Sequence, residues 1–229
     1  NLALFQDDLD TADMCFKKAI LEGQKRNDPY LLGAGFSGQG ELYGMRSIFF
    51  LANQYLDHAA NFLDLNHFGE FIRVKNRKVN LLLQQSMPSQ AILLLKEIAQ
   101  LFPIAKTEFD HLMVAESNYY LASAYLYAGE YKTAFEVCRE IEKTLRNHHN
   151  PPLQSRVELI LGTIAYSQGD FQRAIDHYGI CLQISEFYSA WNMALQASIY
   201  TSYATLKLGR LFQSWDHIKN CFHLSEVYE

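Results

Sequence analysis

Two pairs of histidine and cysteine have the spacing of metal ligands on one side of a helix. His177 precedes Cys181 by four residues, and His217 precedes Cys221 by the same interval. Residues four apart lie on one face of an α-helix, and imidazole and thiolate groups are common ligands of Zn²⁺. The two pairs occupy the same place in two similar stretches of sequence, so a periodic fold alone explains why they recur. We therefore predict that the cysteines belong to a hydrophobic core, and we expect no metal site and no cofactor.

A glycine-rich stretch from Gly33 to Gly44 has the form of a dinucleotide-binding loop. Its phrase GAGFSG fits the pattern G-x-G-x-x-G. That loop needs a preceding strand and a βαβ unit, whereas helical patterns lie on both sides of this stretch. The sequence instead favours a flexible connection between helices, whose role it does not define.

Sequence motifs for catalysis are missing. The chain has no G-x-S-x-G nucleophile elbow, no P-loop and no H-E-x-x-H zinc motif. The carboxylates of Glu136, Glu140 and Glu142 fall on the outer face of a predicted helix, where acidic side chains are usually solvated. We therefore expect that this chain is not an enzyme.

Composition argues against two further classes. The net charge is −5, whereas a general nucleic-acid binder needs a basic face to neutralise phosphates. No apolar run reaches the roughly 18 residues of a membrane span, and no signal-peptide pattern opens the sequence. We expect no direct binding to nucleic acid or membrane, and a cytoplasmic location with the nucleus as the alternative.

The elements that would position these residues repeat along the chain. Stretches of similar sequence cover 121–141, 161–182 and 201–222, forty residues apart. In each, two helical patterns flank a glycine, and a small residue follows the glycine after five positions. These glycines are Gly129, Gly169 and Gly209, and the small residues are Ala134, Ala174 and Ser214. Self-similarity at a fixed period of this length is typical of a solenoid.

The order of small, aromatic and turn residues in these stretches resembles the tetratricopeptide repeat (TPR) family. The resemblance implies an all-α fold, a right-handed α-solenoid of antiparallel helix pairs. It covers nearly the whole chain and is most regular over 119–229. The forty-residue period and the long helices are also similar to the sensor arms of large ATP-dependent transcription activators, the MalT-like group.

The helical patterns predict one array over 1–229. The chain does not begin with Met and its first residues match the second half of a repeat, so we expect a fragment of a longer protein that begins mid-repeat. The expected helices are 8–25, then the pairs 41–53 with 56–65, 71–85 with 89–101, 109–127 with 131–147, 153–167 with 171–184, and 189–207 with 211–226.

Small side chains are expected where paired helices touch, because they allow axes to approach to about 8–10 Å. On the first helices these residues are Ser47, Val79, Ala122, Gly162 and Ser202. Large residues are expected to fill the wedges between successive pairs: Tyr131, Phe171, Tyr178 and Trp215.

In TPR arrays the first helix of each pair lines a concave groove, so the resemblance implies a partner-binding surface. Its residues here are Arg73, Asn76, Asn80, Gln84, Glu116, Tyr119, Ser123, Tyr127, Arg156, Thr163, Tyr166, Gln196, Tyr203 and Lys207. Such a surface suits hydrogen bonds to a peptide backbone or stacking on a ring. Any solenoid must also solvate its exposed face, which is the simpler explanation for the polar members.

The basic stretch 73–80 suggests the Lys/Asn/Arg clamp with which some TPR proteins hold a C-terminal carboxylate. Tyr120 and Ile160 stand roughly where that clamp needs its amide and basic groups, so the clamp is not expected. The basic stretch suits an acidic segment, or simply a solvated face.

Three functions remain open at this stage. The first is a non-catalytic interaction module that binds a partner peptide or protein segment in its groove. The second is a TPR arm of a MalT-like transcription regulator that senses a small-molecule effector. The third is a structural scaffold subunit in a multisubunit assembly, which Phe, Leu or Trp side chains exposed on the convex side would favour. The identity of the partner and the oligomeric state are not readable from the sequence.

Overall fold

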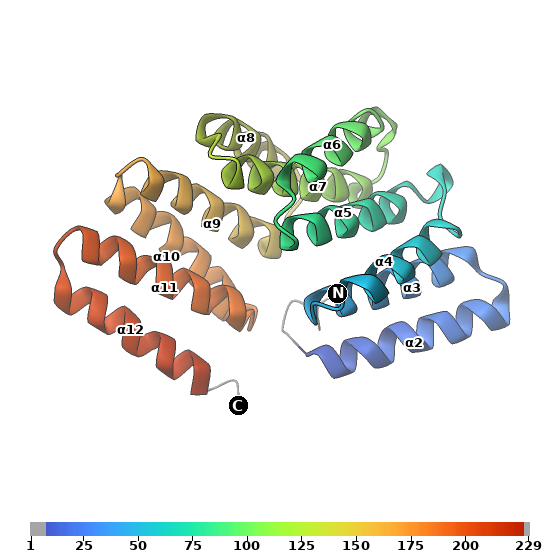
Figure 1. Cartoon of the computed structure of the whole chain (residues 1–229), viewed down its shortest axis with the longest axis horizontal. Coiled ribbons are helices and arrows are strands. Elements are labelled where there is room, and N and C mark those ends of the chain that lie inside the picture. Colours follow the sequence, from blue (N-terminus) through green and yellow to red (C-terminus); the bar gives the residue numbers. More distant parts are fainter. Residues whose placement is uncertain (1–7, 227–229) are drawn as a thin grey trace. The chain divides into compact units, whose positions relative to one another are not determined.

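The computed structural model describes residues 8–226, with side chains through Phe222. Within this range the chain forms eleven α-helices and two short 3-10 turns, and no strand. The all-α prediction is therefore confirmed. The helices fall into two compact units, 8–129 and 130–226, and each is described by itself (Figure 1).

The first unit contains six α-helices that pack in chain order. They are α2 (Leu9–Arg26), α3 (Pro29–Met45), α4 (Phe49–Ala60), α5 (Phe68–Gln84), α6 (Pro88–Ala99) and α7 (Glu108–Tyr127), with 3-10 turns at Leu65–His67 and Phe102–Ile104. Each helix from α2 to α6 packs against the next. In addition, α5 packs against both α3 and α7, so the first helices of successive pairs lie side by side.

The second unit contains the remaining five helices. They are α8 (Tyr131–Asn147), α9 (Pro151–Ser167), α10 (Phe171–Phe187), α11 (Trp191–Lys207) and α12 (Leu211–Glu226). Each helix packs against the next, and α9 also touches α11. From α5 onward the bounds agree with the sequence-based prediction to within three residues.

The turns between paired helices share one backbone conformation. Two residues after the end of each first helix lies a residue with φ between 58° and 81°: Ser47, Ser86, Gly129, Gly169 and Gly209. Glycine adopts this region without steric cost, so the glycine turns were recognisable in the sequence and the serine turns were not. Five positions after each turn lies a small residue at most 5% exposed: Ala52, Ala91, Ala134, Ala174 and Ser214.

The prediction of a flexible connection at Gly33–Gly44 is wrong, because this stretch lies within helix α3. Asp28 caps the helix by accepting hydrogen bonds from two backbone N–H groups, and Pro29 occupies the first turn. The glycines are buried against neighbouring helices. A Cβ on Gly38 would lie 2.2 Å from the ring of Phe16 in α2. Close packing on both sides thus offsets the cost of about 1 kcal/mol that each glycine brings to a helix.

The expected pair 41–53 with 56–65 is wrong for the same reason. Once α3 begins at Pro29, the small contact position falls on Gly40, and Ser47 becomes the turn residue. A Cβ on Gly40 would lie 2.7 Å from Cγ of Leu56 in α4. The glycine therefore allows α3 and α4 to approach closely. The repeat pattern predicts a small residue at this position of each first helix.

The core of the second unit confirms part of the predicted packing. The hydroxyl of Ser214 donates a 2.9 Å hydrogen bond to the carbonyl of Ser202, so these two small residues meet as expected. Tyr178 is 2% exposed and fills the space between helices. Trp215 does not, because more than half of its surface is exposed. It lies on the last described helix of the unit, and no further described helix covers it.

Candidate functional site

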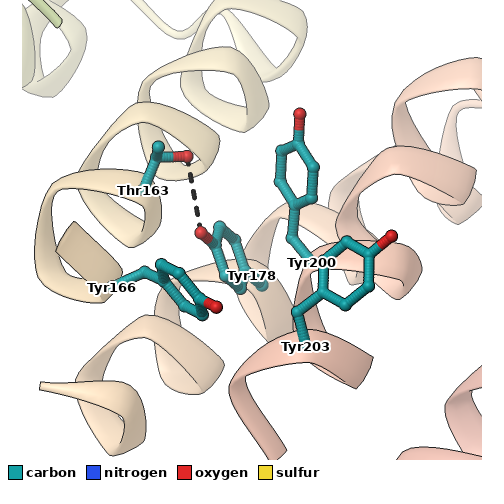
Figure 2. Close-up of a pocket in the computed structure, with 5 residues that line it drawn as sticks. All are labelled: Thr163, Tyr166, Tyr178, Tyr200 and Tyr203. Atoms are coloured by element: carbon teal, nitrogen blue, oxygen red, sulfur yellow. Dashed lines mark hydrogen bonds between the residues drawn. The ribbon is translucent and has the colours of Figure 1, made fainter. Parts of the chain in front are cut away.

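Five side chains enclose a pocket in the second unit. Thr163 and Tyr166 come from α9, Tyr178 from α10, and Tyr200 and Tyr203 from α11 (Figure 2). The space they line has a volume of about 270 Å³. We call it the tyrosine pocket.

The repeat brings these residues together. Thr163 and Tyr203 hold the same position in successive repeats, forty residues apart. Tyr166 follows Thr163 by three residues and Tyr200 precedes Tyr203 by three, so each pair lies on one face of its helix. Because α9 and α11 both pack against α10, these two faces converge above Tyr178.

Tyr178 forms the floor of the pocket. Its hydroxyl donates a 3.4 Å hydrogen bond to Oγ1 of Thr163, marked by the dashed line in Figure 2. Burial raises the pKa of Tyr178 to about 12, so the phenol is neutral at physiological pH. Its ring centroid lies 5.6 Å from that of Tyr200, with 55° between the ring planes.

The walls are more open than the floor. Tyr166 and Tyr200 are partly buried, and Tyr203 is 54% exposed. None of the five lining residues carries a charge, so the pocket has no side chain suited to proton transfer near pH 7. It offers ring faces and hydroxyl groups, which bind by dispersion, by hydrogen bonds and by attraction of a cation to an aromatic face.

A second, polar pocket lies in the first unit between α3, α5 and α7. It is lined by Glu41, Arg73, Asn76, Arg77, Glu116 and Tyr120. Its volume of about 20 Å³ is enough for about one water molecule. This cluster is an internal polar contact between helices rather than a cavity for a ligand.

The basic stretch 73–80 is largely occupied by partners within the first unit. Arg73 forms a 2.6 Å ion pair with Glu70, and its guanidinium lies 4.6 Å from the centroid of the Phe109 ring. Burial, together with the nearby guanidinium of Arg77, lowers the pKa of Arg73 below its ordinary value.

Two further cations of this stretch are also paired. Arg77 forms a 2.5 Å ion pair with Glu41, and Lys78 pairs with Asp57. An incoming acidic segment would have to compete with these carboxylates. The stretch is therefore a poor candidate for an anion site.

Asn76 is predicted as a groove residue, and the structure gives it a packing role. It is 1% exposed. Its amide donates a 3.1 Å hydrogen bond to the carbonyl of Met113, and its Oδ1 accepts a 2.7 Å bond from the hydroxyl of Ser117. Both partners lie in α7, so this side chain joins α5 to α7 and has little freedom to meet a partner.

The other predicted groove residues differ in their exposure to solvent, and they lie in both units. Gln84, Tyr127, Gln196, Tyr203 and Lys207 are exposed, Ser123 is buried, and Arg73, Asn80, Glu116, Tyr119, Arg156, Thr163 and Tyr166 are partly buried. The structure brings Thr163, Tyr166 and Tyr203 together in the tyrosine pocket. It gathers Arg73, Asn76 and Glu116 at the polar pocket.

Two pocket residues were missing from the predicted groove. Tyr178 was assigned only to the wedge between helices, although its ring also faces the pocket. Tyr200 was left out, although it stands forty residues after Ile160 and eighty after Tyr120, on the same helical face as Tyr203. This forty-residue spacing could have identified Tyr200 from the sequence.

The histidine and cysteine pairs do not converge on a metal site. Nδ1 of His177 lies 2.7 Å from Oε2 of Glu158, which links α10 to α9. Cys181 is fully buried, and burial raises the pKa of its thiol to about 12. In residues 8–222 no three side chains of His, Cys, Asp and Glu lie close enough together to hold a metal ion. None of the helices that the structure describes has both the length and the apolarity to span a membrane.

Comparison with known proteins gives matches in structure but not in sequence. No family model and no curated protein matches the sequence. Among solved structures, BtubC from P. vanneervenii is similar with a TM-score of 0.68 and 14% identity, over 98% of this chain and 92% of that chain. A signal transduction ATPase (STAND) from Pyrococcus horikoshii, described as carrying a tetratricopeptide repeat sensor, is similar with a TM-score of 0.69 and 13% identity over 100% of this chain.

The chain has a TPR fold. Aspartyl phosphate phosphatase F from Bacillus subtilis is similar as well, with a TM-score of 0.67 and 14% identity over 91% of this chain. This chain spans 55% of the phosphatase and 36% of the STAND protein. At these identities the TPR likeness is one of fold, so the function must be argued from the tyrosine pocket itself.

Proposed function

We propose that this TPR chain is a non-catalytic interaction module, and that the tyrosine pocket receives a side chain from a bound partner segment. The observation that carries the proposal is the pocket's construction. First helices from two successive repeats supply four of its five residues, and first helices line the groove in TPR arrays.

The exposure of these rings favours binding over simple solvation. A solvated helix face is expected to carry charged or small polar side chains, whereas three of the pocket's four tyrosines are only partly buried or exposed. Tyrosine is enriched in binding sites because its large rigid ring contributes contact area at low entropic cost. Its hydroxyl can form hydrogen bonds with water when the site is empty. A recess of about 270 Å³ between such rings has the character of an anchor site.

The test is a peptide-display selection against the purified chain, followed by titration of the selected segments. We expect Tyr200→Ala and Tyr203→Ala each to weaken binding by about tenfold or more, as for the truncation of an anchor contact. Phe50→Ala is the control, since Phe50 is an exposed aromatic side chain of α4, in the other unit and outside the predicted groove. Equal affinity in all three variants would place the binding surface elsewhere.

A second candidate, the scaffold subunit, is favoured by apolar side chains exposed on second helices. Phe187 of α10 is 81% exposed and Phe212 of α12 is 89% exposed. In α10, Phe171 and Ile175 pack against a core that includes Ala204 of α11. Their counterparts in α12 are Leu211 and Trp215, which are mostly exposed. Leu211, Phe212 and Trp215 lie within five residues on α12, and exposed apolar side chains grouped in this way favour an interaction surface.

The two candidates are separated by where a partner binds. A partner that covers α12 would lose affinity on Phe212→Ser and would be unaffected by Tyr203→Ala. The sensor arm of a MalT-like regulator stays a third proposal. The TPR sensor in the STAND protein supports it by fold likeness alone, and a small-molecule effector would occupy the same tyrosine pocket.

A further inference from the structure

We infer that the tyrosine pocket is an aromatic cage for a quaternary ammonium group. The inference rests on the proposed function and names the chemistry of the group that enters the pocket. The group would be either the side chain of a methylated lysine on a partner segment or the head of a free small molecule such as choline.

The arrangement of the rings suits a compact guest. Tyr178 and Tyr200 meet at 55°, with centroids 5.6 Å apart, and the rings of Tyr166 and Tyr203 stand on either side of Tyr178 in Figure 2. Tilted rings form a cup, whereas a flat aromatic guest needs two parallel walls. The face of each ring carries the negative part of its quadrupole, so a cup of ring faces attracts a cation.

The polar groups of the pocket favour an alkylated cation over a bare ammonium. A bare ammonium brings three N–H donors, each of which needs an acceptor when water is removed. The pocket holds no carboxylate; its only side-chain acceptors are hydroxyl oxygens, and that of Thr163 already accepts a hydrogen bond from Tyr178. A quaternary ammonium has no N–H group to satisfy, so it loses less on entering an uncharged aromatic pocket.

Depth and size agree with this guest. The floor is the nearly fully buried Tyr178, so a group that reaches it leaves water behind, and cation–π attraction is stronger in such a site than at an open surface. The volume of about 270 Å³ accommodates a trimethylammonium head with its methylene stem. None of the lining side chains is cationic, so no repulsion opposes entry.

The test compares a cation with its neutral isostere. Choline and 3,3-dimethyl-1-butanol have the same shape but differ in charge at the central atom. Each is titrated into the chain, and the Thr163 methyl resonance is followed by NMR. We expect choline to bind about tenfold more tightly than the alcohol. Equal affinities, or no response of Thr163 to choline, would overturn the inference.

Variants separate the rings from their hydroxyl groups. Tyr203→Phe keeps the ring and should retain choline binding within about threefold, whereas Tyr203→Ala should weaken it by about tenfold. Phe50→Ala, at an exposed aromatic position of α4 in the other unit, is the control and should change nothing. A loss of binding in Tyr203→Phe as large as in Tyr203→Ala would show recognition by the hydroxyl and would contradict a cage.

A second arm distinguishes the source of the cation. A display-selected segment is synthesised with lysine and with trimethyllysine at its anchor position. Tighter binding of the trimethyllysine form assigns the cage to a modified partner, and binding of choline without that gain assigns it to a free molecule. If the segments bind through the pocket while choline binds no more tightly than the alcohol and trimethyllysine no more tightly than lysine, the cage fails and the proposed function stands.

Discussion

The ring of Tyr178 lies directly against the backbone of Gly162. A Cβ on this glycine would fall 2.4 Å from Cε1 of the tyrosine. The contact links the repeat pattern to the site, because the small residue that lets α9 and α10 approach also seats the floor of the tyrosine pocket.

We expect Gly162→Ala to destabilise the chain. The added methyl group would lie 2.4 Å from a ring that is 2% exposed, so the ring or the helix must shift. Overpacking of this kind costs about 1–3 kcal/mol, and the gain in helix propensity offsets only about 1 kcal/mol of it. Urea denaturation of the wild type and the variant measures the difference.

Gly179→Ala is the matched control for this change. Gly179 lies in α10 one residue after Tyr178, and a Cβ there meets no heavy atom within 4 Å. We expect this variant to be as stable as the wild type or more stable by up to about 1 kcal/mol. Equal effects of the two substitutions would contradict the packing of α9 on α10.

The glycine helix α3 offers a test by compensation. Gly38→Ala should cost about 1–3 kcal/mol, because its methyl group would meet the ring of Phe16. Phe16→Leu removes ring atoms from this contact. The double variant should therefore lose less unfolding free energy than the two single variants lose together, by at least about 0.5 kcal/mol. Strict additivity in a double-mutant cycle would show that α2 and α3 do not meet here.

The buried amide of Asn76 should be important for stability. Asn76→Ala removes one acceptor of the Ser117 hydroxyl, which can still donate to the carbonyl of Met113, and takes the amide donor away from that carbonyl. Each lost buried hydrogen bond costs about 1–3 kcal/mol, so thermal and chemical unfolding should show a clear loss. Gln84→Ala, at an exposed position of the same helix, should stay within about 0.5 kcal/mol of the wild type.

Stability should fall in acid through Asp110 at the start of α7. Burial raises the pKa of this carboxyl, but hydrogen bonds from the backbone N–H groups of Thr107 and Lys106 outweigh that effect and hold the pKa below its ordinary value. A carboxylate with a lowered folded-state pKa stabilises the fold above its unfolded value of about 3.9. The contribution is lost as the pH falls through the folded-state value.

Asp110→Asn isolates this contribution. We expect it to lower the free energy of unfolding by about 1–2 kcal/mol at pH 7, because Asp110 is half of a capping box with Thr107. As the pH falls below the unfolded-state pKa of about 3.9 and through the folded-state pKa, the difference in unfolding free energy between wild type and variant should shrink. Urea titrations at several pH values measure it, and a difference that stays constant down to pH 2 would rule out the carboxylate as the source.

Much of the fold followed from the sequence where glycine marks the turns. Gly129, Gly169 and Gly209 fix the register of three repeats, and the helices around them were predicted closely. The register was lost at Ser47, because a serine gives no sign that it will adopt positive φ. The error then extended to Gly33–Gly44, where glycine in the sequence indicates a loop and only close packing against α2 and α4 makes a helix stable.

The site followed from the sequence only in part. Helical register placed Thr163, Tyr166 and Tyr203 on one face, and the structure adds Tyr178 and Tyr200. Register also placed Asn76 on a groove face, but it says nothing of the neighbouring helix. The carbonyl of Met113 and the hydroxyl of Ser117, which hold this amide, come from about forty residues farther along the chain. Such contacts depend on how helices stack, which a single helix pattern does not determine.

Photocrosslinking shows directly whether a partner segment enters the tyrosine pocket. Benzoylphenylalanine is placed at Tyr203 in one sample and at the exposed Phe212 of α12 in another, and each is irradiated with a display-selected segment. We expect a crosslink from position 203 that Tyr200→Ala abolishes, and none from position 212. A crosslink from position 212 alone, unaffected by Tyr200→Ala, would place the partner outside the tyrosine pocket.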